Sequence, residues 1–318
     1  MGRTFSEFEG NPVVKHGGRD PRLLWYEPTK QWVMAVYDEG TGKQCVAFYT
    51  SPDLKAWTFQ SRIEGFYECP DFFELPVNGD AAKKKWILTA ASSDYMIGSF
   101  DGKTFTPETP KLKGHQGGGY YAAQTFSHDP KGRTIQIGWL QVETRGMPFN
   151  QAMSLPNQLT LRSTPEGPRL AWTPVEELKS LRVKSHNLGT LDLAVGAPNP
   201  IAKASGELLE LRATFTPPTS GEVKFILRGI PIIYNAEQKA VLLGGHRAPA
   251  VLKDGKLDLT VFTDRSTYET FVSGGLVYMP MHVTPNATAL GADVTVTEGN
   301  VQFEKLELHE LKSIWAKP

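Results

Sequence analysis

The feature that most constrains the fold is a repeat of 48 to 49 residues in the first half of the chain. The segments SPDLKAWTF (51–59) and SFDGKTFTP (99–107) share the pattern S-x-D-x-K-x-aromatic-T-x at an offset of 48 residues. The tripeptide RDP (19–21) likewise precedes ECP (68–70) by 49 residues. A period of roughly 40–50 residues, with about four strands in each unit, is typical of a β-propeller. The alternative is a series of unrelated β-hairpins.

Short segments rich in aromatic and β-branched residues, separated by Gly, Pro, Asp and Lys, predict strands along most of the chain. The first region contains RLLWYE (22–27), WVMAVYD (32–38), CVAFYTS (45–51), DFFELP (71–76), KKWILTAA (84–91), YMIGSF (95–100), YYAAQTF (120–126) and TIQIGWL (134–140). The second contains ELLELRATFTP (207–217), GEVKFILRG (221–229), KLDLTVFTD (256–264), TYETFVSGG (267–275) and NVQFEKLELHEL (300–311). The best helical segment, PVEELKSLR (174–182), lies between them and begins with Pro. We therefore expect two domains, residues 1–182 and residues 183–318.

Charge and composition exclude several classes of function. The 318 residues include 34 basic and 34 acidic side chains, so nothing favours nucleic acid or an anionic membrane as a partner. The two cysteines, Cys45 and Cys69, form neither a disulfide framework nor a metal-ligand cluster. The seven histidines include no closely spaced pair, so we expect no metal and no cofactor. No apolar run is long enough to span a bilayer, and no secretory signal is visible, which leaves the localisation open.

The propeller prediction brings two distant carboxylates together. The first strand of each unit lines the central channel of a propeller, so residues at the starts of successive units converge on one pocket. Asp20 and Glu68 occupy such positions, and Arg19 lies beside them. A pair of carboxylates suits glycoside hydrolysis, in which one group protonates the leaving oxygen and the other attacks or activates water. The alternative is that Asp20 and Glu68 cap strands or pair with basic residues.

Other residues near this pocket are weaker candidates. Trp139 has an aromatic ring that could stack on a sugar, although most propeller tryptophans belong to the core. We expect Cys69 to pack beside Glu68 rather than to act as a nucleophile, because no histidine is close in sequence. We expect Asp71 and Glu74 to serve turns or to face solvent.

These residues resemble glycoside hydrolase family 32, which comprises invertases, inulinases, levanases and related β-fructosidases. The segment EGNPVVKHGGRDPRLLWY (9–26) contains the Arg-Asp-Pro motif of that family, and YECPDFFEL (67–75) looks like its Glu-Cys-Pro motif. The segment LDLTVFTDRSTYETFVSGG (257–275) is similar to the signature strand pair of the C-terminal β-sandwich of the family. The segments YYAAQTF (120–126), IGWLQ (137–141) and MSLPNQLTL (153–161) fit later propeller segments of the family. Together with the three motifs, which occur in the family order, they extend the resemblance over nearly the whole chain.

The resemblance implies an all-β fold, with a five-bladed type of β-propeller followed by a β-sandwich. It implies a retaining hydrolase of β-fructosyl linkages in fructans or sucrose-type carbohydrates. Within the site, it makes Glu68 the acid/base and Asp20 the stabiliser of the transition state. Arg19 helps to orient the sugar ring, and Tyr120 and Trp139 are candidate substrate contacts. Family members are often secreted or periplasmic.

The chain also departs from the family pattern. The family nucleophile is an aspartate in a Trp-Met-Asn-Asp-Pro-Asn-Gly motif, and neither this motif nor the later Ser-Gly-Ser motif occurs here. Residues 1–182 would hold three to four units of 48 residues, whereas five units need roughly 240 residues. The segments GGGYY (117–121) and FNQAMSLP (149–156) also differ from many relatives, which leaves the exact substrate contacts open.

These departures lead us to expect an N-terminally incomplete propeller whose nucleophile is absent from this chain. Its open edge invites self-association or completion by a partner chain, as in a split enzyme. The alternative is a non-catalytic remnant that binds fructan.

Overall fold

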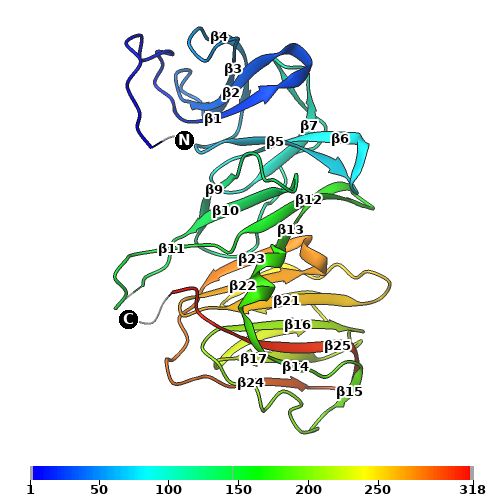
Figure 1. The fold of residues 1–318 in the computed structure, drawn as a ribbon. Coiled ribbons are helices and arrows are strands. Elements are labelled where there is room, and N and C mark those ends of the chain that lie inside the picture. Colours follow the sequence, from blue (N-terminus) through cyan, green and yellow to red (C-terminus); the bar gives the residue numbers. More distant parts are fainter. Residues whose placement is uncertain (1–2, 145, 316–318) are drawn as a thin grey trace. The chain divides into compact units, whose positions relative to one another are not determined.

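The structure is a computed structural model that describes residues 3–144 and 146–315. The described residues form antiparallel strands joined by turns, together with three short 3-10 helices (Figure 1). The all-β prediction is therefore confirmed. No helix in the described parts of the chain is long and apolar enough to cross a membrane.

The chain divides into two compact units. The first consists of residues 1–113 and 122–124, and the second of residues 114–121 and 125–318. This division differs from the expected domains, so the boundary near residue 182 stays a prediction. Each unit is described by itself.

The first unit begins with a four-stranded antiparallel sheet in the order β1-β2-β3-β4, drawn in blue in Figure 1. Its elements are β1 (Arg19–Tyr26), the 3-10 helix η1 (Glu27–Thr29), β2 (Gln31–Asp38), β3 (Cys45–Ser51) and β4 (Thr58–Glu64). All seven residues of β3 are buried, on both faces of the sheet. A strand that is apolar on both faces is typical of an inner layer.

A second sheet packs on one face of the first. This sheet has nine strands in all, and its strands in the first unit have the order β5-β6-β7-β8, with β5 (Asp71–Val77), β6 (Asp80–Thr89), β7 (Tyr95–Phe100) and β8 (Phe105–Pro107). Phe72 on β5 joins the two sheets, because its ring contacts Phe48 of the first sheet and stacks on Trp86 at a centroid distance of 4.6 Å. Two stacked groups of four antiparallel strands are the arrangement that the repeat predicts for successive propeller blades.

The repeated S-x-D-x-K segment has a structural cause. Asp53 lies in the β3–β4 turn, and Asp101 lies in the β7–β8 turn, at the same place in each sheet. One Oδ1 atom in each turn accepts two backbone N–H bonds, as in an Asx-turn. The donors are Lys55 (2.8 Å) and Ala56 (2.9 Å) in the first turn, and Lys103 (2.8 Å) and Thr104 (2.7 Å) in the second.

The other face of the first sheet is also apolar. Leu23, Met34, Tyr49 and Phe59 are paired neighbours on β1, β2, β3 and β4, so they form a row across all four strands. Residues before β1 cover the middle of this face. Leu23 and Trp25 at one end, and Phe59 at the other, remain exposed. We call this surface the open apolar face.

Within the second unit, strands of the nine-stranded sheet pair antiparallel in the order β11-β10-β12-β13. The strand β9 (Tyr120–Thr125) has residues in both units. The other strands are β10 (Thr134–Leu140), β11 (Ala152–Met153), β12 (Asn157–Thr164) and β13 (Gly167–Pro174). The expected helical segment forms a 3-10 helix, η2 (Glu176–Leu181), because only one short stretch of chain separates two strands there.

The remainder of the second unit is a two-sheet sandwich. One sheet has the order β14-β25-β16-β21-β22-β23 with β15 beside β25, and the other has the order β20-β19-β18-β17-β24. Phe215, Phe225 and Phe303 are fully buried between them. The strands are β14 (Arg182–Asn187), β15 (Leu191–Ala194), β16 (Leu209–Phe215), β17 (Glu222–Leu227), β18 (Ile230–Asn235), β19 (Ala240–Leu243), β20 (His246–Pro249), β21 (Leu257–Thr263), β22 (Thr267–Val272), β23 (Val277–His282), β24 (Ala292–Val296) and β25 (Asn300–Leu311), with η3 (Ser273–Gly275) after β22.

A glycine-rich segment covers the edge of the first sandwich sheet. The N–H of Gln116 donates to the carbonyl of Tyr278 (2.8 Å), and the N–H of Gly118 donates to the carbonyl of Pro280 (2.9 Å), so the segment lies along β23. A Cβ atom at Gly117 would lie 1.8 Å from the carbonyl oxygen of Pro280. This close approach requires glycine, and the segment pairs an edge that would otherwise stay open.

Candidate active site

The RDP and ECP motifs lie side by side in the first unit, with the first residue of one beside the first of the other and the second beside the second. Arg19 donates from Nε to Oε2 of Glu68 (3.0 Å), and its Nη2 lies 2.9 Å from the same oxygen. One residue further on, the N–H of Cys69 donates to Oδ2 of Asp20 (3.1 Å). Each contact joins residues 49 apart, the repeat offset found in the sequence. The structure therefore brings Arg19, Asp20 and Glu68 together.

The same offset joins a buried ion pair beneath these residues. Arg22 Nε lies 3.1 Å from Oδ1 of Asp71, whose side chain is 0% exposed. The expectation that Asp71 serves a turn or faces solvent is wrong, because burial of an aspartate requires a compensating partner and Arg22 supplies one. Glu74 is exposed and pairs with Lys84 at 3.0 Å.

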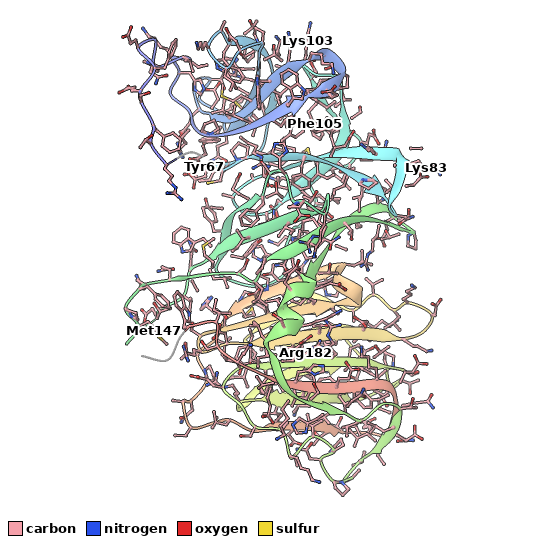
Figure 2. All side chains as sticks on the ribbon, viewed as in Figure 1. Tyr67, Lys83, Lys103, Phe105, Met147 and Arg182 are labelled. Atoms are coloured by element: carbon pink, nitrogen blue, oxygen red, sulfur yellow. The ribbon has the colours of Figure 1, made fainter. Side chains whose placement is uncertain are left out.

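Arg19 is the centre of the charged cluster. Besides Glu68, its guanidinium binds Oε1 of Glu39 (2.5 Å) through Nη1 and the hydroxyl of Tyr67 (3.3 Å) through Nη2. Its Cζ lies 4.6 Å from the ring centroid of Tyr37, a cation–π distance. Figure 2 marks Tyr67 at the margin of the first unit, just before β5. The hydrogen bonds that Arg19 donates to Glu39 and to Glu68, in that order of effect, raise its pKa above its already high value, so it stays charged.

The backbone at these motifs is unusual. Asp20 (φ 60°), Glu68 (φ 36°) and Cys69 (φ 45°) all adopt the left-handed region. The pairing of β1 with β2 is also irregular between Arg19 and Arg22. Such conformations cost of the order of 1 kcal/mol or more for residues other than glycine, and they cluster at functional sites. They turn the three side chains out of the regular alternation of a strand.

Neighbouring segments hold the ECP backbone in this conformation. The N–H of Ala91 donates to the carbonyl of Glu68 (3.0 Å), and the side-chain amide of Gln124 donates to the carbonyl of Cys69 (3.0 Å). Burial, together with the negative charge of Asp20, raises the pKa of the Cys69 thiol to about 12. A thiol with that pKa is protonated at neutral pH, so Cys69 packs at the site without being a nucleophile.

Tyr120 and Trp139 belong to the second unit. Tyr120 is buried, donates its hydroxyl to Oε1 of Gln136 (3.3 Å) and meets the ring of Tyr278 edge to face. Trp139 is 38% exposed, and its indole N–H donates to Oε1 of Gln151 (3.2 Å). Their roles as substrate contacts stay predictions.

The second unit also contains a buried acid that sequence reasoning did not consider. Glu269 on β22 is 3% exposed; its carboxyl accepts bonds from the N–H of Leu155 (2.7 Å) and from the hydroxyl of Tyr278. Burial raises the pKa of Glu269 to about 7. The available signal was an acid in the strand TYETFV (267–272), whose other residues are mostly uncharged and apolar. In residues 3–144 and 146–315, no group of three or more His, Cys, Asp or Glu side chains is placed to hold a metal ion.

Comparisons with known proteins cover both halves of the chain. Residues 1–174 match the model of the glycosyl hydrolases family 32 N-terminal domain, and residues 177–310 match that of the glycosyl hydrolases family 32 C-terminal domain. A levanase of Bacillus subtilis (strain 168) is 30% identical over 368 residues, which cover 99% of this chain and 54% of that enzyme. An extracellular exo-inulinase of Aspergillus ficuum is 26% identical, with 99% of this chain and 70% of that enzyme covered.

Solved structures show the same fold. An exo-inulinase of Aspergillus awamori aligns with a TM-score of 0.82 at 21% identity, covering 96% of this chain and 71% of that chain. Fructan 1-exohydrolase IIa of Cichorium intybus aligns with a TM-score of 0.80 at 18% identity, covering 96% and 75%. The predicted β-propeller followed by a β-sandwich is thereby confirmed.

The chain spans about half the length of the Bacillus subtilis levanase that it matches. The family resemblance read from the RDP, ECP and DRSTYETF segments is confirmed by two family models that together cover most of the sequence. This chain belongs to glycosyl hydrolases family 32.

Proposed function

We propose that this protein acts in the hydrolysis of β-fructosyl linkages in fructans or sucrose-type carbohydrates, with Glu68 as the acid/base. The observation that carries the proposal is the contact between Arg19, Asp20 and Glu68 in a family 32 chain. The names of its relatives, levanase and exo-inulinase, support this class of substrate. The exo-inulinase of Aspergillus ficuum is named extracellular, which supports a protein that meets polysaccharide outside the cell.

In the proposed reaction, Glu68 donates its proton to the glycosidic oxygen while a carboxylate nucleophile bonds to the anomeric carbon. The C–O bond to the leaving sugar breaks, and a fructosyl ester forms with the nucleophile. Glu68 then takes a proton from water, whose oxygen attacks the anomeric carbon and releases fructose with retained configuration. Asp20 binds sugar hydroxyls, because a carboxylate can accept more bonds than the two from the N–H and the thiol of Cys69.

We propose that the nucleophile comes from a polypeptide segment other than residues 1–318. Asp20 is a poor substitute, because its Oδ2 is bound by the Cys69 N–H and its charge lies 3.9 Å from Arg19. The open apolar face supports such a segment. The opposite face of the same sheet packs on the strands β5 to β8, so another layer of strands suits the exposed Leu23, Trp25 and Phe59.

This face also supports a second candidate function. A partner chain or a second copy bound at the open apolar face would complete the site in an assembly, and without it the chain would bind fructan without cleaving it. Light scattering of the purified chain distinguishes these cases. Self-association predicts a mass that rises with concentration, whereas a compact monomer argues against a second copy as the partner.

The central experiment measures fructose release from sucrose, inulin and levan by the purified chain. Glu68→Gln removes the proposed acid, and Glu64→Gln is the matched control because Glu64 is an exposed glutamate on β4 paired with Lys43. Release that is lost only in Glu68→Gln supports the proposed role of Glu68. Equal release by both variants would overturn it. No release, together with saturable binding of levan or inulin in calorimetry, supports the binding protein, and absence of binding rejects it.

A further inference from the structure

We propose that Glu39 is a positioning residue that locks Arg19 against Glu68. This inference rests on the proposed function of Glu68, and it concerns a residue outside the RDP and ECP motifs. Glu39 follows β2 directly, in the turn that leads to β3. The strand pairing places this turn beside the RDP motif, because Arg19 on β1 pairs with Tyr37 on β2.

The guanidinium of Arg19 is held on three sides. Its Nη1 binds Glu39 (2.5 Å), and its Nε and Nη2 edge binds Oε2 of Glu68 (3.0 and 2.9 Å). Its flat face lies over the ring of Tyr37. Two carboxylates at different edges of one planar fork fix both the plane and the rotation of the guanidinium. Glu68 alone fixes one edge only.

Hydrogen bonds on both sides of Glu39 fix the backbone that carries its side chain. The preceding Asp38 is buried, its Oδ2 accepts a bond from Arg62 (2.8 Å), and its Oδ1 accepts the N–H of Gly40 (2.8 Å). The N–H of Gly42 donates to the carbonyl of Glu39 (2.8 Å) and closes the turn. Glu39 is therefore anchored on both sides along the chain, although its own side chain is 51% exposed.

The position of Arg19 matters for an acid that must release and regain a proton. A guanidinium that stays on Oε2 orients the carboxyl plane of Glu68, and proton transfer depends steeply on that orientation. An exposed ion pair by itself contributes little to stability. We therefore expect loss of Glu39 to loosen the site while leaving the fold intact.

The test compares Glu39→Gln with Glu64→Gln, since both remove one exposed carboxylate from the first sheet. The first readout needs no catalysis: it is the water exchange rate of the Arg19 Nε–H in nitrogen-15 NMR spectra, assigned by its loss in Arg19→Lys. We expect exchange to accelerate about fivefold or more in Glu39→Gln and to stay unchanged in Glu64→Gln. Equal exchange rates in Glu39→Gln and the unaltered protein would overturn the proposal.

The second readout is kinetic, with fructan as the substrate. Glu39→Gln is expected to lower kcat about tenfold with little change in KM, because positioning of the acid matters in the transition state. A raised KM with unchanged kcat would mean that Glu39 binds substrate and would reject the positioning role. If the unaltered chain releases no fructose, that result agrees with a nucleophile supplied by another polypeptide segment, and the exchange measurement alone decides whether Glu39 locks Arg19.

Discussion

Two glutamates in two family motifs have opposite surroundings. Glu68 in the first unit is half-buried and shares the guanidinium of Arg19 with another carboxylate. Glu269 in the second unit is buried, and neutral groups donate to its carboxyl, among them the Leu155 N–H and the Tyr278 hydroxyl. Glu269 has the strongly raised pKa, about 7, which is often taken as the mark of a catalytic acid.

The comparison shows that a raised pKa indicates a buried carboxyl group and does not by itself identify a catalytic one. The carboxyl of Glu269 is closed in by β22, β23 and the segment before β12, so a sugar cannot reach it. Glu68 lies among strained backbone and charged groups that a substrate can approach. Geometry therefore assigns the roles: Glu269 joins parts of the second unit, and Glu68 is the proposed acid.

The largest difference between Glu269 and Glu68 is expected in the free energy of unfolding that is lost when each carboxyl group is removed. Glu269→Ala leaves the Leu155 N–H and the Tyr278 hydroxyl without an acceptor, so we expect a loss of about 4 kcal/mol in the free energy of unfolding. Glu68→Ala should change it by less than about 1 kcal/mol, because the lost pair with Arg19 is partly exposed. Urea titrations followed by tryptophan fluorescence measure both. Equal losses would break the comparison.

The pH dependence of the free energy of unfolding tests the same comparison between Glu269 and Glu68. The pKa of Glu269 is raised on folding from 4.5 to about 7, so the folded state binds its proton more tightly than the unfolded state does. This stabilisation is fully present below pH 4.5 and is lost as the pH rises through 7, by no more than about 3 kcal/mol. Unfolding curves across this window, compared with Glu269→Gln, isolate the contribution. A Gln variant with the same pH slope would contradict the assignment.

A buried pair also exists beneath Glu68, and its loss should cost less. Asp71→Asn keeps an oxygen that can accept from Arg22 but removes the charge that balances the guanidinium. We expect a loss of about 2 kcal/mol, because Arg22 is not wholly buried and regains some hydration. Asp71→Leu combined with Arg22→Met should recover most of the stability lost by Asp71→Leu alone. Failure of the double variant to recover would mean that the pair is not the cause.

The smallest effect concerns the thiol beside Asp20. The charge of Asp20 adds to burial in raising the pKa of Cys69, so Asp20→Asn should lower that pKa and leave the burial effect in place. We expect alkylation of Cys69 by iodoacetamide at pH 9 to accelerate roughly tenfold, corresponding to about one pKa unit. Mass spectrometry of the peptides separates Cys69 from the buried Cys45, which serves as the internal control. An unchanged rate would show that Asp20 does not contact the thiol in solution.

The repeat offset explains what the sequence could predict about the site. Residues at equivalent positions of neighbouring blades meet across the blades, so an offset of 49 predicts that the starts of the RDP and ECP motifs converge. The same offset joins Arg22 to Asp71, so the repeat also predicts this ion pair. The local sequence around Asp71 does not show this partner, because Arg22 lies 49 residues away, and an acid in an apolar run then suggests a turn.

Other contacts had no such signal. Glu39 reaches Arg19 because a turn between two strands ends beside the start of β1, and strand length rather than residue type decides that position. Gln124 reaches the ECP backbone from β9, and its sequence position relative to the ECP motif does not indicate this contact. The strands themselves were predictable, because alternation and turn residues are local properties, whereas the division into compact units depends on packing between distant segments.

The glycine-rich segment beside β23 has a consequence for the order in which the chain is assembled. Gly118 and its partner His282 are 164 residues apart, so the ribosome makes the segment long before it makes the strand that receives it. At 5–20 residues per second, that interval is roughly 8–30 s. The strands β1 to β8 can pair with one another during this time, whereas the N–H groups of Gln116 and Gly118 still wait for their acceptor carbonyls on β23. The second unit closes only near the end of synthesis, when β23 has emerged.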